Sequence, residues 1–458
     1  MLKNLTAAAA GAANTRGRDA GLGVHTMSAV DAAWLHMDGP ANPAIVVGIS
    51  LTRVPLDFKR VRAVFKRCAD EFDRFRQRVV ESGLLFPALT WADMADFEIE
   101  RHVHRAALPQ PGDEAALRAL IGELAALPLD RALPLWQVHV VDGCEPRGQG
   151  GALIMRYHHC IGDGTAMMAL ATRLFESAAG RRHKLALPAS HLPAHDRPVA
   201  DLLDKAGLVL AGAGTLLADL LIAPDPPSPF KGKFGLGKRV AWSAPVPIAR
   251  VKEIGAPTGA KVNDVMVAIA SGALRGYLRR RGVDVQHTHL RAMVPIDLRP
   301  PEHIGQLGNE FGLAILELPV SNSSARQCLA LSKARMDQVK RSPEAIAMHL
   351  LFDVFGRGPK LVEDLASHIF GSKASVTLTN VVGPLEQVKL AGSPVERMLF
   401  CVPHPGEELG MGISIMIYQG MATLTVIADA HLVPDPEAIT RGFNREFDRL
   451  CRLLPGLS

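Results

Sequence analysis

The feature that most constrains the fold of this chain is a junction between a strand-like and a helix-like segment in its first half. Residues 152–158 form an apolar run that is typical of a buried strand, and residues 165–178 carry apolar side chains at helical spacing. Between them lie Gly162 and Gly164, which we expect to supply the backbone angles of a tight turn. The chain therefore has to place the end of a buried strand directly against the start of a helix.

The connecting segment, residues 158–164, reads His-His-Cys-Ile-Gly-Asp-Gly. Adjacent side chains of a strand point to opposite faces, so we expect only one of His158 and His159 to face a cleft. Histidines on opposite faces do not share a metal ion, and no metal site is expected. A neutral imidazole accepts a proton from an alcohol near pH 7, which indicates a general base. Asp163 would orient the turn through a salt bridge. The alternative is a histidine pair that is simply hydrogen-bonded in the core.

Both halves of the chain mix helical and strand patterns, which predicts an α/β (α+β) fold with two domains. Residues 181–240 are rich in Pro, Ala and Leu and indicate a linker between an N-terminal domain, 27–180, and a C-terminal domain, 241–458. Residues 1–26 are expected to be a disordered extension, with Met27 as an alternative start. We predict helices within 57–82, 113–127, 165–178 and 262–281, and strands at 135–141, 152–158, 290–295, 313–318, 375–379, 412–418 and 423–428.

Composition and missing motifs narrow the function. A net charge of +5 over 458 residues suits anionic ligands or an anionic membrane surface and is too weak to predict nucleic-acid binding. Six scattered cysteines contain no CxxC pair, so a reducing compartment is expected, without a zinc site. No apolar run is long enough to predict a transmembrane helix. Serine-hydrolase, zinc-protease and complete nucleotide-binding motifs are absent, which removes the commonest competing enzymes.

Residues 155–164 resemble the signature of the bacterial wax ester synthase/acyl-CoA:diacylglycerol acyltransferases. Where members of this family often have Phe-Leu followed by a glutamate, this chain has Trp34-Leu35 and Asp38, which leaves the role of that carboxylate in doubt. Further segments match the family's motifs in order between about residues 27 and 450: Met27–Met37, Pro134–Trp136, Val262–Val265, Arg291–Pro300, Leu307–Gly312, Thr379–Pro384 and Gly410–Ser414.

The resemblance implies two chloramphenicol-acetyltransferase-like domains with the active site at their interface. His159 would deprotonate the hydroxyl of diacylglycerol or a long-chain fatty alcohol. That hydroxyl would attack the thioester of acyl-CoA directly, without an acyl-enzyme, and no cofactor beyond this co-substrate is implied. Asp163 would be structural and pair with an arginine, for which Arg299 is our candidate.

The other motif residues have two interpretations each. Asn263, which precedes Asp264, would shape or donate to the oxyanion site, or it would be a helix N-cap. Trp136 is expected to be core rather than ligand-binding, because large aromatic side chains are mostly buried. Arg299 would pair with Asp163 or lie on the surface. Gly164 is expected to have a structural role in the turn. The resemblance implies that Pro134 and Leu135 lie under the wall of the substrate channel and pack against it.

Two other functions compete with this one. Carrier-protein-dependent acyltransferases and condensation-type enzymes share the fold, and a non-catalytic lipid-droplet protein would not need His159. Substrates of the implied kind are insoluble, so we expect a cytoplasmic protein that is peripheral on the inner membrane face or on lipid inclusions. Residues 202–223 are apolar enough to lie in an interface, or they form a linker helix between the domains. Four basic residues follow, namely Lys231, Lys233, Lys238 and Arg239.

Overall fold

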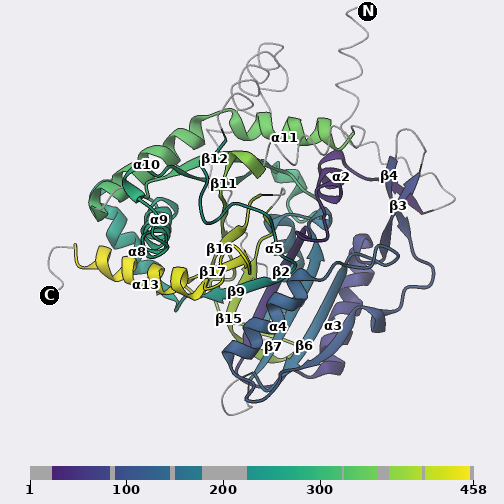
Figure 1. Cartoon of the computed structure of the whole chain (residues 1–458). Coiled ribbons are helices and arrows are strands. Elements are labelled where there is room, and N and C mark those ends of the chain that lie inside the picture. The colour runs from purple at the N-terminus through teal and green to yellow at the C-terminus, as the bar shows by residue number, and fades with distance from the viewer. Residues whose placement is uncertain are drawn as a thin grey trace, which may run out of the picture.

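Two mixed sheets adjoin in the computed structural model, and helices cover their outer faces (Figure 1). The structure describes residues 23–82, 88–144, 150–177, 224–321, 324–357, 371–404 and 408–453. Within these residues the strands form two seven-stranded sheets and a three-stranded one. The predicted linker helix at 202–223 lies outside the described residues.

The first sheet is built mostly from the first half of the chain and contains the predicted strand before the histidines. In this sheet β5 and β6 are parallel, and the other neighbours pair antiparallel. Every residue of β7 is buried, as expected for the apolar run. The strand order is β5 (Val103–Ala107), β6 (Trp136–Asp142), β7 (Gly151–His158), β2 (Ile45–Thr52), β15 (Ser393–Cys401), β14 (Val388–Leu390) and β8 (Phe175–Ser177).

The second sheet belongs to the second half of the chain. Strands β11, β13 and β16 run parallel to one another, and the remaining pairs are antiparallel. The strand order is β10 (Val246–Pro247), β17 (Met421–Asp429), β16 (Met411–Tyr418), β13 (Val376–Val382), β11 (Leu290–Asp297) and β12 (Phe311–Leu318), with β9 (Lys238–Trp242) also paired to β17.

The two sheets do not follow the division of the chain at residue 240 strictly. Strands β14 and β15 come from the second half but extend the first sheet, because β15 pairs with β2 from Val395↔Thr52 to Cys401↔Val47. In the opposite direction, α4 of the first half packs on β9 of the second sheet, and Gly122 comes so close that a Cβ there would lie 2.4 Å from the Lys238 carbonyl oxygen. The two halves are therefore interlocked.

Helices cover both sheets. On the second sheet, α9 packs against α8, α10 and α13, as Figure 1 shows at the left. In the first half α3 packs against α5, whereas α2 packs against α11 of the second half. The helices are α2 (Ala29–His36), α3 (Phe58–Glu71), α4 (Glu114–Ala126), α5 (Gly164–Leu174), α8 (Ile248–Gly255), α9 (Val262–Arg280), α10 (Ala325–Arg341), α11 (Glu344–Phe355) and α13 (Glu437–Cys451).

Three boundaries differ from the sequence prediction. The helix expected over 57–82 ends at Glu71, and residues 77–82 form β3 instead, paired with β4 (Ala88–Asp93). The helix expected to reach Ala178 ends at Leu174, where β8 begins and pairs with β14. Residues Val24–Thr26 form β1 on the other edge of β4, so a strand is present before Met27. In each case pairing with another strand overrides the local pattern; β3 forms a hairpin with the next strand, whereas the partners of β1 and β8 are distant in sequence.

Candidate active site

The histidine turn occupies the junction between β7 and α5, where both halves of the chain meet. His158 ends β7, residues His159–Ile161 form a 3₁₀ turn, and Asp163 is the N-cap of α5. The Gly308 backbone N–H donates to the Ile161 carbonyl oxygen at 3.0 Å, and the Asp163 N–H donates to the Gly308 carbonyl oxygen at 3.3 Å. A loop of the second half is thus bonded directly to the turn.

Close contact, rather than unusual backbone angles, explains the two glycines of the turn. Gly162 has φ 167°, an extended conformation open to any residue, and Gly164 is the first residue of α5. A Cβ at Gly162 would lie 2.8 Å from the Ala166 Cβ and 3.2 Å from the Gly308 nitrogen. A Cβ at Gly164 would lie 3.3 Å from a methyl group of Val381. The expectation of special backbone angles was wrong, because Gly162 is extended and Gly164 is helical; close neighbours from both halves of the chain limit the space for a side chain instead.

His159 lines a cavity of about 410 Å³, whereas His158 is buried away from it. The His159 ring stacks on Trp34, with centroids 3.8 Å apart, and lies 5.8 Å from the Phe311 ring. Burial lowers the pKa of His159 to about 4, so the imidazole is neutral at pH 7. His159 is therefore in the protonation state that a general base requires.

Asn309 fixes which nitrogen of His159 carries the proton. The Asn309 backbone N–H and its Nδ2 both donate to Oδ1 of Asp31, at 3.1 and 2.7 Å, and Nδ2 also donates to the His159 carbonyl oxygen. The remaining amide oxygen faces Nδ1 of His159 at 3.0 Å. Because that oxygen only accepts, the neutral imidazole holds its proton on Nδ1. Nε2 is left with a free lone pair for a bound ligand.

His158 has a different environment. Its Nδ1 accepts the N–H of Cys160 at 3.1 Å, and its Nε2 lies 3.7 Å from Oδ2 of Asp38. Burial alone would raise the pKa of the Asp38 carboxyl, but its contacts with His158, Ala44 and Arg131 hold that pKa below the usual value. The role of Asp38, which the sequence left open, is thus to contact His158, the histidine that does not line the cavity.

Asp163 forms the ion pair expected from the sequence. Its Oδ2 lies 2.9 Å from the Arg299 guanidinium and accepts the Glu310 N–H, while its Oδ1 accepts the Ala166 N–H. The Arg299 side chain is only 1% exposed, so the surface alternative is wrong. Arg299 also donates to carbonyl oxygens of Gln306 and Gly308. This pair therefore joins the histidine turn to the loop that carries Asn309.

Pro134, Leu135 and Trp136 lie behind the turn and not among the side chains that line the cavity. The Leu135 carbonyl oxygen accepts the His158 N–H at 2.9 Å. Trp136 is fully buried and donates its indole N–H to the Phe75 carbonyl oxygen at 3.0 Å. The three residues belong to the core that supports the end of β7.

Asn263 lines the cavity, but it is not the N-cap of α9. That position belongs to Lys261, whose backbone N–H donates to Asp264 at 2.8 Å, so the N-cap interpretation of Asn263 was wrong. The side-chain oxygen of Asn263 accepts Nδ2 of Asn380 at 2.5 Å. Asp264 is buried, and one of its oxygens lies 3.5 Å from Lys340. The structure thus joins Asn263 to Asn380, and His159 to Asn309.

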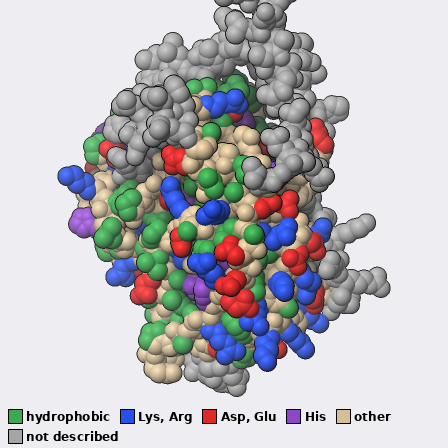
Figure 2. Space-filling model, turned by 90° about the vertical axis from the view of Figure 1, so that its right-hand side faces the viewer, with side chains coloured by type: hydrophobic (Ala, Val, Ile, Leu, Met, Phe, Trp, Pro, Cys, Tyr) green, Lys and Arg blue, Asp and Glu red, His purple; other side chains and the backbone are tan. Residues whose placement is uncertain are grey.

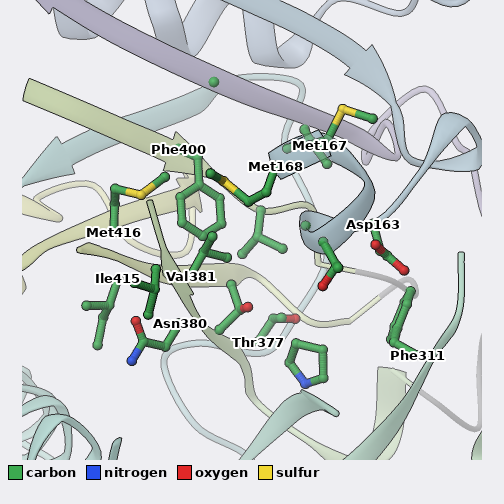
Figure 3. Close-up of a pocket in the computed structure, with 18 of the residues that line it drawn as sticks. Asp163, Met167, Met168, Phe311, Thr377, Asn380, Val381, Phe400, Ile415 and Met416 are labelled. Atoms are coloured by element: carbon green, nitrogen blue, oxygen red, sulfur yellow. The ribbon is translucent and has the colours of Figure 1, made fainter. Parts of the chain in front are cut away.

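The cavity itself is mostly apolar and lies between elements of both halves. Figure 3 shows Asp163 from the histidine turn and Phe311 from β12 at one side, with Asn380, Ile415 and Met416 at the other. Eight of the chain's 15 methionines line it: Met155, Met167, Met168, Met266, Met293, Met336, Met398 and Met416. Methionine adapts its shape easily, so this wall suits long apolar chains of varied length.

Three residues at the site were not assigned a role from the sequence. Trp34, Asp31 and Asn309 all lie within segments that match the family's motifs, yet nothing in the local pattern connects them to His159. Asp31 and Asn309 are 278 residues apart and meet only in the folded chain. Only the presence of Asp31 and Asn309 in separate motifs signalled that they matter.

Two family descriptions match the chain. The wax ester synthase/diacylglycerol acyltransferase catalytic domain matches residues 27–218, and the WS/DGAT C-terminal domain matches residues 307–451. A probable diacylglycerol O-acyltransferase of Mycobacterium tuberculosis is 30% identical over 434 residues, which cover 89% of this chain and 88% of the relative. The chain belongs to the wax ester synthase/diacylglycerol acyltransferase family. It is an acyltransferase, as the motifs predict.

Solved structures place this acyltransferase in the expected fold class. A wax ester synthase/diacylglycerol acyltransferase from Marinobacter aquaeolei matches with a TM-score of 0.67 and 21% identity, over 93% of this chain and 98% of that one. Trichothecene 15-O-acetyltransferase from Fusarium sporotrichioides matches at 0.63 and 12%, over 94% and 95%. The starter condensation domain of rhizomide synthetase, in complex with C8-CoA, matches at 0.59 and 14%, over 94% of each chain. These likenesses confirm the two-domain acyltransferase fold.

Proposed function

We propose that this protein transfers a long-chain acyl group from acyl-CoA to the hydroxyl of diacylglycerol, of a long-chain fatty alcohol, or of both. The observation that carries the proposal is the neutral His159, held by Asn309 through Nδ1, in the wall of a large apolar cavity. The curated relatives support diacylglycerol as an acceptor through their names, and the family name adds wax ester synthesis. Both acceptors present one hydroxyl on a long apolar body.

The chemistry follows from the state of His159. Nε2 accepts the proton of the acceptor hydroxyl as its oxygen attacks the carbonyl carbon of the thioester. The tetrahedral intermediate then collapses, the carbon–sulfur bond breaks, and the imidazolium returns its proton to the departing CoA thiolate. Trp34 and Phe311 exclude water from the ring, which disfavours hydrolysis of the thioester. Asp31 and Asn309 are positioning residues, because they act through His159.

The test is release of CoA from palmitoyl-CoA by the purified protein, measured in parallel with diacylglycerol and with hexadecanol. His159→Ala should reduce the rate by at least about a hundredfold, the usual scale for a general base. His158→Ala should reduce it less, because His158 supports the turn. Equal rates for the parent protein and His159→Ala would contradict the mechanism. The paired acceptors decide between triacylglycerol and wax ester synthesis.

A carrier-protein-dependent reaction is the remaining alternative, since condensation domains share the fold. The resemblance of the motifs to those of the acyl-CoA:diacylglycerol acyltransferases favours acyl-CoA as the donor. Transfer from a palmitoyl-carrier protein that exceeds transfer from palmitoyl-CoA would reverse this preference.

Association with a membrane or lipid inclusion belongs to the same proposal, because the acceptors reside there. Among the described residues, no helix has the length and apolar character needed to span a membrane. On the face shown in Figure 2, Lys and Arg side chains are interspersed with Asp and Glu. The described residues of this face therefore form no uniform basic surface toward anionic lipid.

A further inference from the structure

The second sheet is open where the cavity enters it. Strands β11 and β13 are paired only at Ala292↔Val376 and Met293↔Thr377. Beyond these positions β11 continues to pair with β12 on its other edge, as far as Asp297, and β13 continues to pair with β16 as far as Val382. The facing edges of the two parallel strands thus separate in the middle of a sheet.

Both separated stretches line the cavity, namely residues 294–297 of β11 and 378–382 of β13. An unpaired strand edge presents backbone N–H and C=O groups that need partners. Pro295 has no N–H and lies in the separated stretch, a position suited to a strand edge without a neighbour. The gap is therefore a track on which an extended ligand with amide groups can bind as an added strand does.

Two side-chain oxygen atoms beside this track also lack hydrogen-bond partners. Within the described part of the chain, the Thr377 hydroxyl and the Asn380 side-chain oxygen are buried and make no hydrogen bond. Asn380 donates to the Asn263 oxygen at 2.5 Å, so the pair leaves one amide N–H₂ group and one amide oxygen for a ligand. Exchanging O and N in both side chains gives the same result. One free donor beside one free acceptor is the complement of a secondary amide.

We propose that the gap between β11 and β13, with the Asn263–Asn380 pair, binds a secondary amide of the pantetheine arm that carries the acyl thioester. This subsite rests on the proposed function, because it names the part of the acyl donor that is recognised. The pantetheine arm is an extended chain with two secondary amides and little else to hydrogen-bond. An acceptor such as diacylglycerol has no amide, and its one hydroxyl has to reach His159.

The location of the pair agrees with this assignment. Figure 3 shows Asn380 on the opposite side of the labelled cavity residues from Asp163 and Phe311, which mark the side of His159. The arm would thus lie along the second sheet and present the thioester toward the histidine turn. Asn263 then recognises the leaving group, in place of the oxyanion role expected from the sequence.

The experiment compares Asn263→Leu and Asn380→Leu with the parent on three palmitoyl thioesters. Palmitoyl-CoA has both amides, the N-acetylcysteamine thioester has the amide nearest sulfur, and the benzenethiol thioester has none. We expect each variant to lower kcat/KM about tenfold for palmitoyl-CoA, through KM, because the remaining partner is left unpaired. The benzenethiol thioester should react at the parent's rate. An equal loss on all three would overturn the subsite and assign the pair to the reaction centre or to folding.

A binding measurement separates this proposal from the proposed function. Calorimetric titration of the parent with CoA and with 3′,5′-ADP, which lacks the arm, should give tighter binding for CoA. In each variant the affinity for CoA should fall about tenfold and that for 3′,5′-ADP should stay unchanged. Unchanged CoA affinity in both variants, or no difference between the two ligands in the parent, overturns the subsite. Weakened CoA binding in a protein without acyl transfer would sustain the subsite and refute the proposed function.

The same arm occurs in CoA and in holo carrier proteins, and the titrations distinguish the two sources. A holo carrier protein that binds more tightly than CoA, and loses affinity in Asn380→Leu, would sustain the amide subsite with the carrier as its donor. A holo carrier protein that binds equally to the parent and the variant would show that its arm does not reach this gap.

Discussion

The first prediction concerns the pH dependence of activity that we expect from the burial of His159. The pKa of His159 is lowered to about 4, and the active form is the neutral one, so activity is lost only as the pH falls through that value. We expect kcat/KM to be level from about pH 5.5 to 8 and to decline below that range. The measurement is a pH–rate profile under conditions where circular dichroism shows a folded protein.

His139 provides a matched control for this profile. Burial also lowers its pKa to about 4, but it lies on β6 and is not among the residues that line the cavity. His139→Gln should keep the acidic limb of the profile. A limb near pH 6.5 in the parent would show that His159 titrates as an ordinary solvated histidine.

Asn309→Asp tests whether Asn309 controls the proton of His159. The variant is combined with Asp31→Asn, because one oxygen of the new carboxylate takes the place of Nδ2, which lies 2.7 Å from the Asp31 carboxylate. The other oxygen would lie beside Nδ1, where the amide oxygen is 3.0 Å away, and would favour the charged imidazolium. The pKa of His159 should rise, and the acidic limb should move to higher pH. Asn309→Leu removes the acceptor instead and should lower kcat roughly a hundredfold, without this movement.

These two variants distinguish a role of Asn309 in positioning His159 from a purely structural role. A merely structural Asn309 would change the melting temperature in both variants and leave the pH profile in place. Unchanged kcat and an unchanged profile in both, with the fold retained, would contradict the role of Asn309.

At the scale of elements, Asp163 holds the start of α5 to the loop of the second half. Asp163→Asn removes the carboxylate 2.9 Å from the Arg299 guanidinium, which is 1% exposed, and leaves only Glu310 at 4.0 Å. Breaking one side of a buried ion pair costs about 3–5 kcal/mol, so the free energy of unfolding should fall by that order. Chemical denaturation measures it. Asp284→Asn is the control, because that carboxylate is 66% exposed beside His287 and its loss should cost less than about 1 kcal/mol.

A contrary result for Asp163 would be informative. If Asp163→Asn were as stable as the parent and wholly inactive, Asp163 would have a direct part in the chemistry. The contacts with Arg299, Glu310 and Ala166 favour the structural role.

The elements could be predicted from the sequence where their own periodicity decides them. Strand β7 and helix α9 agree with the apolar patterns of 152–158 and 262–281 to within a residue. The pattern failed at residues 77–82, which form a hairpin with the strand directly after them, and at 175–177, which pair with the distant strand β14. The exchange of β15 into the first sheet has no local signal for the same reason.

The candidate site was predictable only in part. His159 and the Asp163–Arg299 pair followed from motifs and from the need of a buried carboxylate for a partner. The stacking of Trp34 on His159, and the hydrogen bonds from Asp31 through Asn309, depend on how α2 and the loop before β12 meet the turn. Contacts between segments so distant in the chain cannot be predicted from a single sequence.

At the scale of the whole molecule, the basic residues after the predicted linker helix change the expected attachment to membranes. Lys238 is buried, bonds to Asn42, and has its pKa lowered by burial to about 8. Lys231 donates to the Ser372 carbonyl oxygen at 2.7 Å, with its side chain 8% exposed. Both lysine side chains are buried and hydrogen-bonded within the protein, so the expected surface patch of four basic residues was wrong. Lys233 and Arg239 remain exposed.

The last prediction concerns this smaller patch. Because a basic residue near an anionic surface contributes about 1 kcal/mol, Lys233→Gln with Arg239→Gln should weaken binding to anionic vesicles by at most roughly 30-fold. Binding to neutral vesicles should not change, since no charge is neutralised there. Flotation with both vesicle types, at low and high salt, makes the measurement. The exposed Arg441 and Arg445 of α13, changed together to Gln, are the charge-matched control. Failure of the parent to float with either vesicle, together with full activity on dispersed substrate, would refute attachment to the interface.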